Sequence, residues 1–223
     1  MKYLETYMNS DRGKMEKEAF DFLITDLLSR NLRGVDKQRT LTAHNMEDAL
    51  ENQLVPSMFY LLMYAKSDKP EVIGKNEFYD VCPLIMCLNV NDKFVTGLNF
   101  NFIPNDVRAR IMDLIVESNQ KFYQEMETIN INSIKVNNPL GSMLISDKGV
   151  SSFLLFVKSK TGLDVSKCVR TYDRKNIMNV RLIEYDEWHY IPYLSFKDSI
   201  RGSNLANVQR DVIIGVDDKQ INS

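Results

Sequence analysis

The chain has 223 residues, 44% of them hydrophobic, which is enough to bury the core of one domain, or a core with a helical arm. Its 28 Lys and Arg residues nearly balance 30 Asp and Glu residues, so the composition does not indicate a globally basic nucleic-acid-binding protein, although a local basic patch is compatible with it. The three cysteines and two histidines lack the paired spacing of a zinc site, and the longest apolar run, Met58 to Ala65, is far shorter than the ~20 residues that cross a bilayer. We therefore expect free thiols in a reducing compartment, no metal or cofactor, no membrane segment and no signal peptide.

The first predicted element is a helix from Met15 to Leu32. Its apolar side chains recur at helical spacing and form one stripe. They are Phe20, Leu23, Ile24, Leu27 and Leu28. The stripe has two interpretations. It packs on its own domain, or residues 1–54 form a helical arm that docks on an adjacent subunit, which the break at Val55-Pro56 permits.

Short apolar runs bounded by turn residues then predict strands at 58–64, 83–90 and 94–102, the last two joined by a hairpin-length polar turn. Gly97 interrupts the third strand, which predicts a bulge or a close backbone approach. The polar segment 67–76 is predicted as a loop. Three strands with a tight hairpin favour an antiparallel sheet or a small barrel.

A strong amphipathic pattern predicts a helix that begins after Pro104 and ends before Asn130. The Asn-rich segment 130–147 is predicted as a loop. A further helix is predicted over 149–160, with Gly162 as the residue that stops it.

The rest of the chain predicts shorter elements. A short helix is predicted over 164–172, a strand over 179–184, a tight aromatic turn over 185–192 and a last helix around 205–213, before the polar tail 217–223. These boundaries give an arm (1–54), an α+β core domain (55–216) and a tail.

Basic residues are concentrated between positions 158 and 181, where seven positive side chains meet only two negative ones. The seven are Lys158, Lys160, Lys167, Arg170, Arg174, Lys175 and Arg181. Such a patch contacts phosphates, faces an acidic neighbour in an oligomer, or is a solvated surface, and the sequence leaves these three readings open.

Asp186 and Glu187 beside His189 form the densest acid–base cluster, since acid–base catalysis needs a carboxylate and an imidazole in one cleft. The same residues also suit the start of a helix, with the acids at its N-terminus and Trp188 in the core. The dispersed glycines form no phosphate-binding loop. We therefore expect a protein that is not an enzyme.

Five segments carry sequence blocks in a fixed order: Phe78–Ile85, Thr96–Pro104, Arg108–Asp113, Cys168–Tyr172 and Asp186–Trp188. They read FYDVCPLI, TGLNFNFIP, RARIMD, CVRTY and DEW. Together they resemble the motifs of a family of small virion-associated proteins of tailed bacteriophages, some of them labelled DNA end protectors. The resemblance covers about Met58 to Phe196 and implies a component of the phage particle.

The expected fold is α+β: a small antiparallel sheet or SH3-like barrel with inserted helices and an N-terminal helical arm. The expected function is a structural subunit of a ring or adaptor at the portal, neck, tail or baseplate of the virion, made in the host cytoplasm. Its expected partners are copies of itself and other phage structural proteins, with no small-molecule substrate. The alternative is a DNA-binding protein that acts on phage genome ends through the basic residues.

Overall fold

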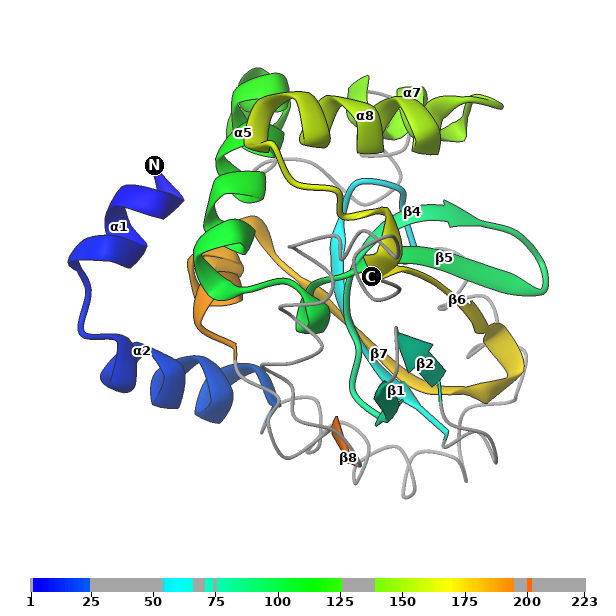
Figure 1. Cartoon of the computed structure of the whole chain (residues 1–223), viewed down its shortest axis with the longest axis horizontal. Coiled ribbons are helices and arrows are strands. Elements are labelled where there is room, and N and C mark those ends of the chain that lie inside the picture. The colour runs from blue at the N-terminus through cyan, green and yellow to red at the C-terminus, as the bar shows by residue number, and fades with distance from the viewer. Residues whose placement is uncertain are drawn as a thin grey trace, which may run out of the picture.

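A curled five-stranded antiparallel sheet lies beside a layer of helices in the computed structural model of the chain, which describes residues 2–24, 54–65, 71–73, 76–125, 139–194 and 200–201 (Figure 1). The strand order is β6-β5-β4-β1-β7. The strands are β1 (Phe59–Tyr64), β4 (Leu84–Val90), β5 (Phe94–Asn99), β6 (Val169–Asp173) and β7 (Ile177–Ile183). All neighbouring pairs are antiparallel, which confirms the predicted α+β fold with an antiparallel sheet.

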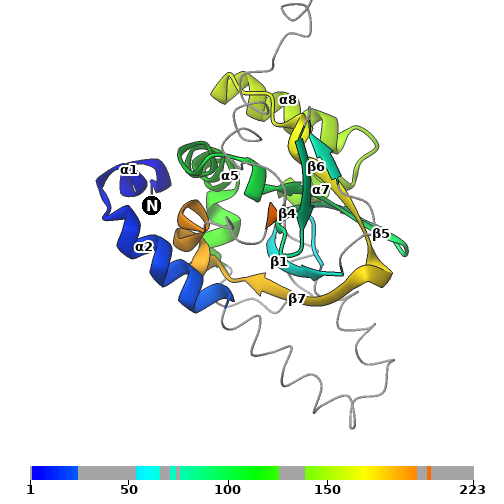
Figure 2. The same cartoon turned by 60° about the horizontal axis from the view of Figure 1, so that its bottom comes forward.

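The sheet closes toward a barrel because its two edge strands are neighbours in sequence. β6 and β7 are joined only by the 3-10 turn η5 (Arg174–Asn176). Four Cα steps span at most about 15 Å, whereas a flat sheet of five strands is about 19 Å wide. The sheet must therefore curl until its edges meet at η5, and Figure 2 shows this curvature. This strand order, with a 3-10 turn before the last strand, is that of an SH3-like barrel.

Contacts at η5 hold this corner of the barrel. The Arg174 N–H donates to the Lys93 carbonyl at 2.9 Å, and the Ala65 N–H donates to the Asn176 carbonyl at 2.7 Å. Tyr64 at the end of β1 meets Tyr172 of β6 edge to face, with ring centroids 5.3 Å apart. The turn is thus tied to the β4–β5 hairpin and to β1 at once.

Gly97 of β5 lies against the Ile85 side chain of β4. A Cβ at this position would come within 2.8 Å of the Ile85 Cβ. The pairing of β4 with β5 also shifts register here, between Cys87 opposite Gly97 and Asn89 opposite Thr96. The predicted bulge is confirmed, and its extra residue lies on the partner strand; the close neighbour of Gly97 is the Ile85 side chain rather than backbone.

The third predicted strand ends earlier than expected. β5 stops at Asn99, and residues Phe100–Phe102 form the 3-10 turn η2. The Asn99 side chain accepts the Asn101 N–H at 2.8 Å, so a local side-chain hydrogen bond turns the chain out of the sheet.

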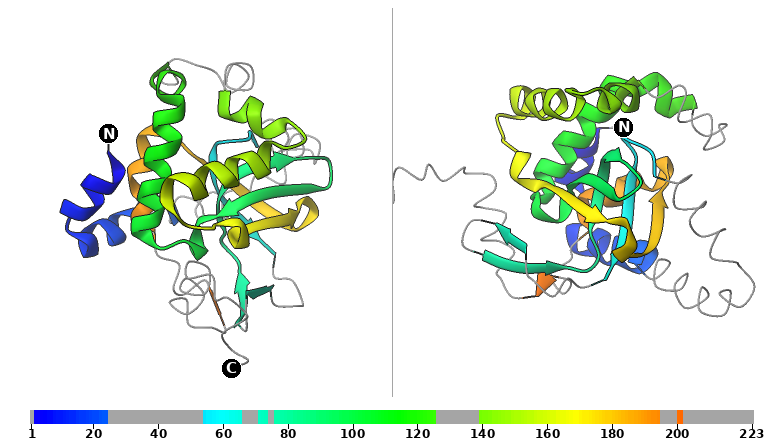
Figure 3. Two further views of the ribbon diagram at one scale, coloured as in Figure 1. Left: turned by 45° about the horizontal axis from the view of Figure 1, so that its top comes forward. Right: turned by 90° about the vertical axis from the view of Figure 1, so that its right-hand side faces the viewer.

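Helices inserted between β5 and β6 gather on one side of the sheet (Figure 3). They are α5 (Asn105–Glu125), α7 (Pro139–Ile145) and α8 (Gly149–Thr161), followed by the 3-10 turn η4 (Ser166–Cys168). The prediction for α8 is confirmed, as is the predicted beginning of α5 after Pro104; the predicted end of α5 lies outside the described residues. Gly162 ends α8 with φ at 74°, the left-handed geometry that favours glycine after a helix.

Two segments in this region differ from the prediction. Within 130–147, residues 139–145 are helical, because Pro139 suits a first helical position and Leu140 and Leu144 are buried on one face. Within 164–172, the chain forms η4 and then β6, because pairing with β5 and the β-favouring side chains outweigh the helical spacing.

The segment predicted as a loop at 67–76 contains strand residues. β2 (Glu71–Ile73) and β3 (Asn76–Asp80) pair with each other, and β3 also pairs with β8 (Ile200–Arg201) in a separate three-stranded sheet. The polar composition hid this hairpin, because the segment lacks the apolar run from which a strand is predicted.

The N-terminal helical arm is present as three short elements: α1 (Tyr3–Asn9), α2 (Arg12–Ala19) and a π-helical turn η1 (Phe20–Ile24). The Asp11 side chain accepts the Lys14 N–H at 3.2 Å and caps α2, so the helix begins earlier than predicted. Residues 25–53, and with them Leu27 and Leu28, lie outside the described part of the chain, as do the predictions for 205–213 and 217–223.

The 3-10 helix η6 (Tyr185–Tyr193) follows β7, where the sequence predicts an aromatic turn or a helix start. Trp188 is fully buried there, and its indole N–H donates to the Ile183 carbonyl at 3.0 Å. Among the helices of the described residues, none combines the length and apolar character needed to cross a membrane.

Candidate interaction surfaces and buried polar contacts

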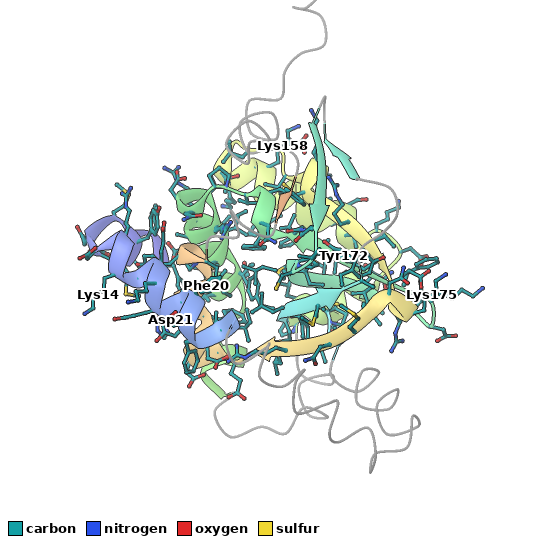
Figure 4. The ribbon with its side chains drawn as sticks, turned by 90° about the horizontal axis from the view of Figure 1, so that it is seen from below. Lys14, Phe20, Asp21, Lys158, Tyr172 and Lys175 are labelled. Carbon is teal, nitrogen blue, oxygen red and sulfur yellow. The ribbon has the colours of Figure 1, made fainter. Side chains whose placement is uncertain are left out.

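The seven basic residues predicted as one patch lie in three different environments. Lys158 and Lys175 are far apart in Figure 4, at the end of α8 and at the η5 corner. Arg181 is 3% exposed and lies in the interior. The chain segment 158–181 folds back along the barrel, so closeness in sequence does not produce one continuous surface.

The group at the end of α8 consists of Lys158 and Lys160 of the helix and Lys167 of the adjacent turn η4. Lys158 forms an ion pair with Asp164, 2.9 Å between Nζ and Oδ2. The Ser166 hydroxyl and then Lys158 hold the pKa of Asp164 down at about 2. Lys160 and Lys167 are exposed and have no carboxylate partner among the described residues.

Arg170 joins this group only in part, because its guanidinium is used by the fold. Its Nη1 donates to the carbonyls of Lys167 and Val169, both at 2.8 Å. The guanidinium also lies 5.4 Å from the ring centroid of Phe102. Arg170 thereby covers carbonyl groups of η4 and of the edge strand β6.

At the η5 corner, the two basic residues also have local partners. Arg174 Nη1 donates to the Asn91 carbonyl at 3.2 Å, and Lys175 pairs with Asp173 at 3.0 Å. Both pairs are at the surface, where such interactions contribute little to stability.

Arg181 is a correction to the predicted surface patch. Its Nη2 lies 2.7 Å from Glu187 Oε1, and Glu187 Oε2 in turn accepts the Glu184 N–H at 3.0 Å. The ring of Phe22 from the arm lies 5.6 Å from the guanidinium. β7 directs this side chain under η6 and the arm, so Arg181 is unavailable to an external phosphate.

The acid–base cluster of η6 has structural partners. Glu184 and Glu187 form a reciprocal capping box at the start of the helix. His189 Nδ1 lies 2.6 Å from the Asp186 carbonyl, and its ring packs against Tyr190 in a tilted geometry with centroids 3.9 Å apart. These contacts confirm the helix-start interpretation of the cluster.

A buried polar network, which the sequence analysis missed, joins β3, β5, η2 and β6. The Asn99 side-chain amide donates to Asp80 at 2.5 Å and to the Tyr172 hydroxyl at 2.8 Å. The Asn101 amide donates to Asp80 at 3.1 Å and to the Cys82 carbonyl at 3.1 Å. The sequence signal for this network is limited to Asn99 and Asn101, two polar residues in an otherwise apolar segment.

Arg108, near the start of α5, is a second buried polar junction missed by the sequence analysis. It donates to the carbonyls of Ile103 (2.7 Å), Leu194 (2.5 Å) and Ile191 (3.4 Å). Burial lowers the pKa of its guanidinium from 12.5 to about 10. The residue ties η2 and the end of η6 to α5.

The apolar stripe of the arm is divided between the interior and the surface. Leu23 is fully buried, whereas Phe20 is 43% exposed; the side chain of Ile24 lies outside the described residues. Met8 and Phe22 are 57% and 49% exposed. The described part of the arm therefore packs on its own domain and also presents apolar side chains outward.

Burial raises the pKa of the Cys82 and Cys168 thiols to about 12, and that of Cys87 further, so none is set up as a nucleophile. Within the described ranges, no three His, Cys, Asp or Glu side chains are grouped as metal ligands. No protein-family model, curated protein or solved structure matches the chain.

Proposed function

We propose that this chain is a non-enzymatic structural subunit of a tailed-bacteriophage virion, in a ring or adaptor at the portal, neck, tail or baseplate. Its partners are copies of itself and other proteins of the particle. The support comes from the resemblance of five sequence blocks to virion-associated proteins, and from the part these blocks play in this fold.

The observation that carries the proposal is that the block residues serve the framework. Asp80, Asn99 and Tyr172 belong to one buried hydrogen-bond network, and each comes from a different block. Arg108 and Trp188 come from two further blocks and bind backbone carbonyls. Sequence blocks whose residues make buried hydrogen bonds within the fold suit a protein with a structural role.

The exposed side chains of the arm support a role in protein contacts. Met8, Phe20 and Phe22 present apolar surface beside the basic and acidic side chains of α2. Aromatic and Met side chains are enriched where protein surfaces meet. A subunit that contacts neighbours through its arm would use such residues.

A second candidate, a DNA-binding protein at genome ends, is favoured by the group at the end of α8. Lys160 and Lys167 are the exposed basic residues there without a carboxylate partner in the described structure. Phosphate contacts by these lysines would weaken steeply with salt. The double variant Lys160→Glu/Lys167→Glu tests them, with Lys14→Glu/Lys175→Glu as the control of equal charge change.

Cryo-electron microscopy of intact particles tests the proposal. Density for the barrel in a symmetric ring that contacts portal, neck, tail or baseplate proteins is the expected result. Density on terminal DNA, together with salt-sensitive DNA binding that only the Lys160/Lys167 variant loses, favours the DNA-binding candidate instead. Absence of the chain from purified particles would overturn the structural role.

A further inference from the structure

An acidic surface with exposed aromatic rings lies where the end of the N-terminal arm meets the start of η6. Phe22 packs on Tyr190 with ring centroids 5.5 Å apart, yet Phe20 and Phe22 both remain exposed. The carboxylates of Asp21 and Asp186 are exposed as well. The arm–η6 surface is defined by Phe20, Asp21, Phe22, Glu184 and Asp186.

Carboxylates outnumber cations on this surface and around it. Residues 14–23 and 184–193 carry six acidic side chains. They are Glu16, Glu18, Asp21, Glu184, Asp186 and Glu187. The cations there are Lys14, Lys17 and the buried Arg181, whose Nη2 lies 2.7 Å from Glu187. Aromatic rings among excess negative charge favour a partner that is apolar and positively charged.

Contacts within the chain hold the arm–η6 surface in place. The carboxylate of Asp113 on α5 accepts the N–H groups of Tyr3 at 2.6 Å and Leu4 at 3.1 Å. Tyr7 of the arm packs on Tyr193 of η6, with ring centroids 5.3 Å apart. A partner therefore meets a surface that is already formed, which lowers the cost of ordering the chain on association.

The outward side of α8 presents the opposite charge around an exposed leucine. Lys148 at the N-cap, Leu155 and Lys158 are separated by seven and three residues, which places them on one side of the helix. All three are exposed, Leu155 by 67%. The other exposed residues on this side are small: Ser151, Ser152 and Ser159. Lys148, Leu155 and Lys158 with these serines define the α8 surface.

Positive charge prevails around the α8 surface. Residues 142–167 carry four lysines against the two acidic residues Asp147 and Asp164. Ile145, three residues before Lys148, adds a second apolar side chain that is 67% exposed. The α8 surface thus offers the apolar and positively charged groups that suit the arm–η6 surface.

The two surfaces lie on different sides of the molecule. α1 and α8 both contact α5, and Figures 1 and 2 show the arm on one side of α5 and α8 on the other. Figure 4 likewise shows Asp21 and Lys158 well apart. The α8 surface can therefore meet an arm–η6 surface only on another copy of the chain.

We propose that the α8 surface of one copy docks on the arm–η6 surface of the next, so that lysines meet carboxylates around Leu155, Phe20 and Phe22. This inference rests on the proposed function, in which copies of the chain form a ring. The occupant is a second copy because one chain carries both complementary surfaces. A contact between two different surfaces leaves one of each unused at the ends, so copies add until the ring closes.

Charge reversal tests this contact through incorporation into particles. Lys148→Glu/Lys158→Glu and Asp21→Lys/Asp186→Lys each set like charges against each other, and each is expected to enter particles at least about tenfold less than the native chain. A chain that carries all four substitutions exchanges the signs of the two surfaces and restores their attraction. It should recover most of the lost incorporation, which a loss of DNA contacts or of local structure would not allow.

The matched control is Lys93→Glu/Lys175→Glu at the η5 corner. It makes the same charge change, and Lys175 has an aspartate partner, Asp173, as Lys158 has Asp164. Its incorporation should stay close to that of the native chain. Unimpaired incorporation of both surface variants would overturn the contact, and so would a fourfold variant that melts like the native chain by circular dichroism and still stays out of particles.

Photo-crosslinking identifies the partner directly. A benzoylphenylalanine in place of the exposed Leu155 should give, in irradiated particles, covalent oligomers joined at residues 20–22 or 184–190 of another copy. The same probe at Asp92, exposed in the turn between β4 and β5, is the control and should not give these products. Cross-links from position 155 to other proteins or to DNA alone would overturn the contact and leave the structural role intact. Absence of the protein from particles would overturn both.

Discussion

The guanidinium of Arg108 donates a 2.5 Å hydrogen bond to the carbonyl of Leu194, 86 residues further along the chain. This contact joins the start of α5 to the end of η6, and no carboxylate is among the acceptors of its hydrogen bonds. Three carbonyl dipoles replace the water that a guanidinium loses on burial.

Replacing Arg108 with Ala is expected to lower the free energy of unfolding by about 3–5 kcal/mol, because three buried carbonyls lose their donor. Arg108→Lys should recover less than half of this loss, since an ammonium cannot reproduce the fork of donors. Urea denaturation measures both. The exposed neighbour Arg110, changed to Ala, is the control and should alter stability by less than about 0.5 kcal/mol.

The buried pair Arg181 and Glu187 gives a second prediction. Arg181→Met leaves the Glu187 carboxylate largely buried without its guanidinium, and we expect a loss of about 2–4 kcal/mol. The double variant Arg181→Met/Glu187→Gln should be more stable than Arg181→Met alone. A thermal or urea denaturation series decides this, and a loss of DNA binding with unchanged stability would contradict the structural role of Arg181.

The network around Asp80 predicts an order of severity among three substitutions. Tyr172→Phe removes one hydroxyl and should cost about 1 kcal/mol. Asn99→Ala removes the donor to both partners and should cost about 3 kcal/mol. Asn99→Asp should be the most damaging, because it sets two carboxylates in contact. Equal effects in urea denaturation would show that the network contributes little.

The corner between α7 and α8 depends on a residue without a side chain. A Cβ on Gly149 would lie 2.0 Å from the Met143 carbonyl oxygen, so Gly149→Ala forces the two helices apart and should cost more than about 3 kcal/mol. Gly162 is the matched comparison: its φ is 74° but nothing lies within 4 Å of an added Cβ, and Gly162→Ala should cost about 1 kcal/mol. Circular dichroism melts compare the two.

The buried thiols predict a loss of stability at alkaline pH. Burial raises the pKa of Cys168 from 9.0 to about 12, so above pH 9 the unfolded chain loses a proton that the folded chain keeps. The unfolded state then binds fewer protons, and the free energy of unfolding falls by about 1 kcal/mol for each such thiol between pH 9 and 10. The window ends at pH 10 because Arg108, with its pKa lowered to about 10, then begins to act in the opposite direction.

Denaturation under reducing conditions at pH 8, 9 and 10 measures this decline. Cys168→Ala should decline less steeply by about 1 kcal/mol over the last step, whatever its stability at pH 8. Parallel declines of the native chain and this variant would show that the Cys168 thiol is not held protonated by the fold.

The elements that the sequence determined by itself are those whose signals are local. The amphipathic spacing after Pro104 specifies α5, and the glycine at 162 specifies the end of α8. The hairpin between 83 and 102 follows from two apolar runs and a polar turn. Each signal lies within one element, because helical periodicity and turn chemistry act over a few residues.

Tertiary structure decided which polar side chains are buried and what they bind. Asn99 and Tyr172 are 73 residues apart, and Tyr3 and Asp113 are 110 apart, so no local pattern couples them. The same cause explains Arg181, which looks like part of a basic surface in sequence and is buried because β7 passes under η6 and the arm. Burial and partner choice are properties of how distant elements pack, and only the folded chain brings those elements together.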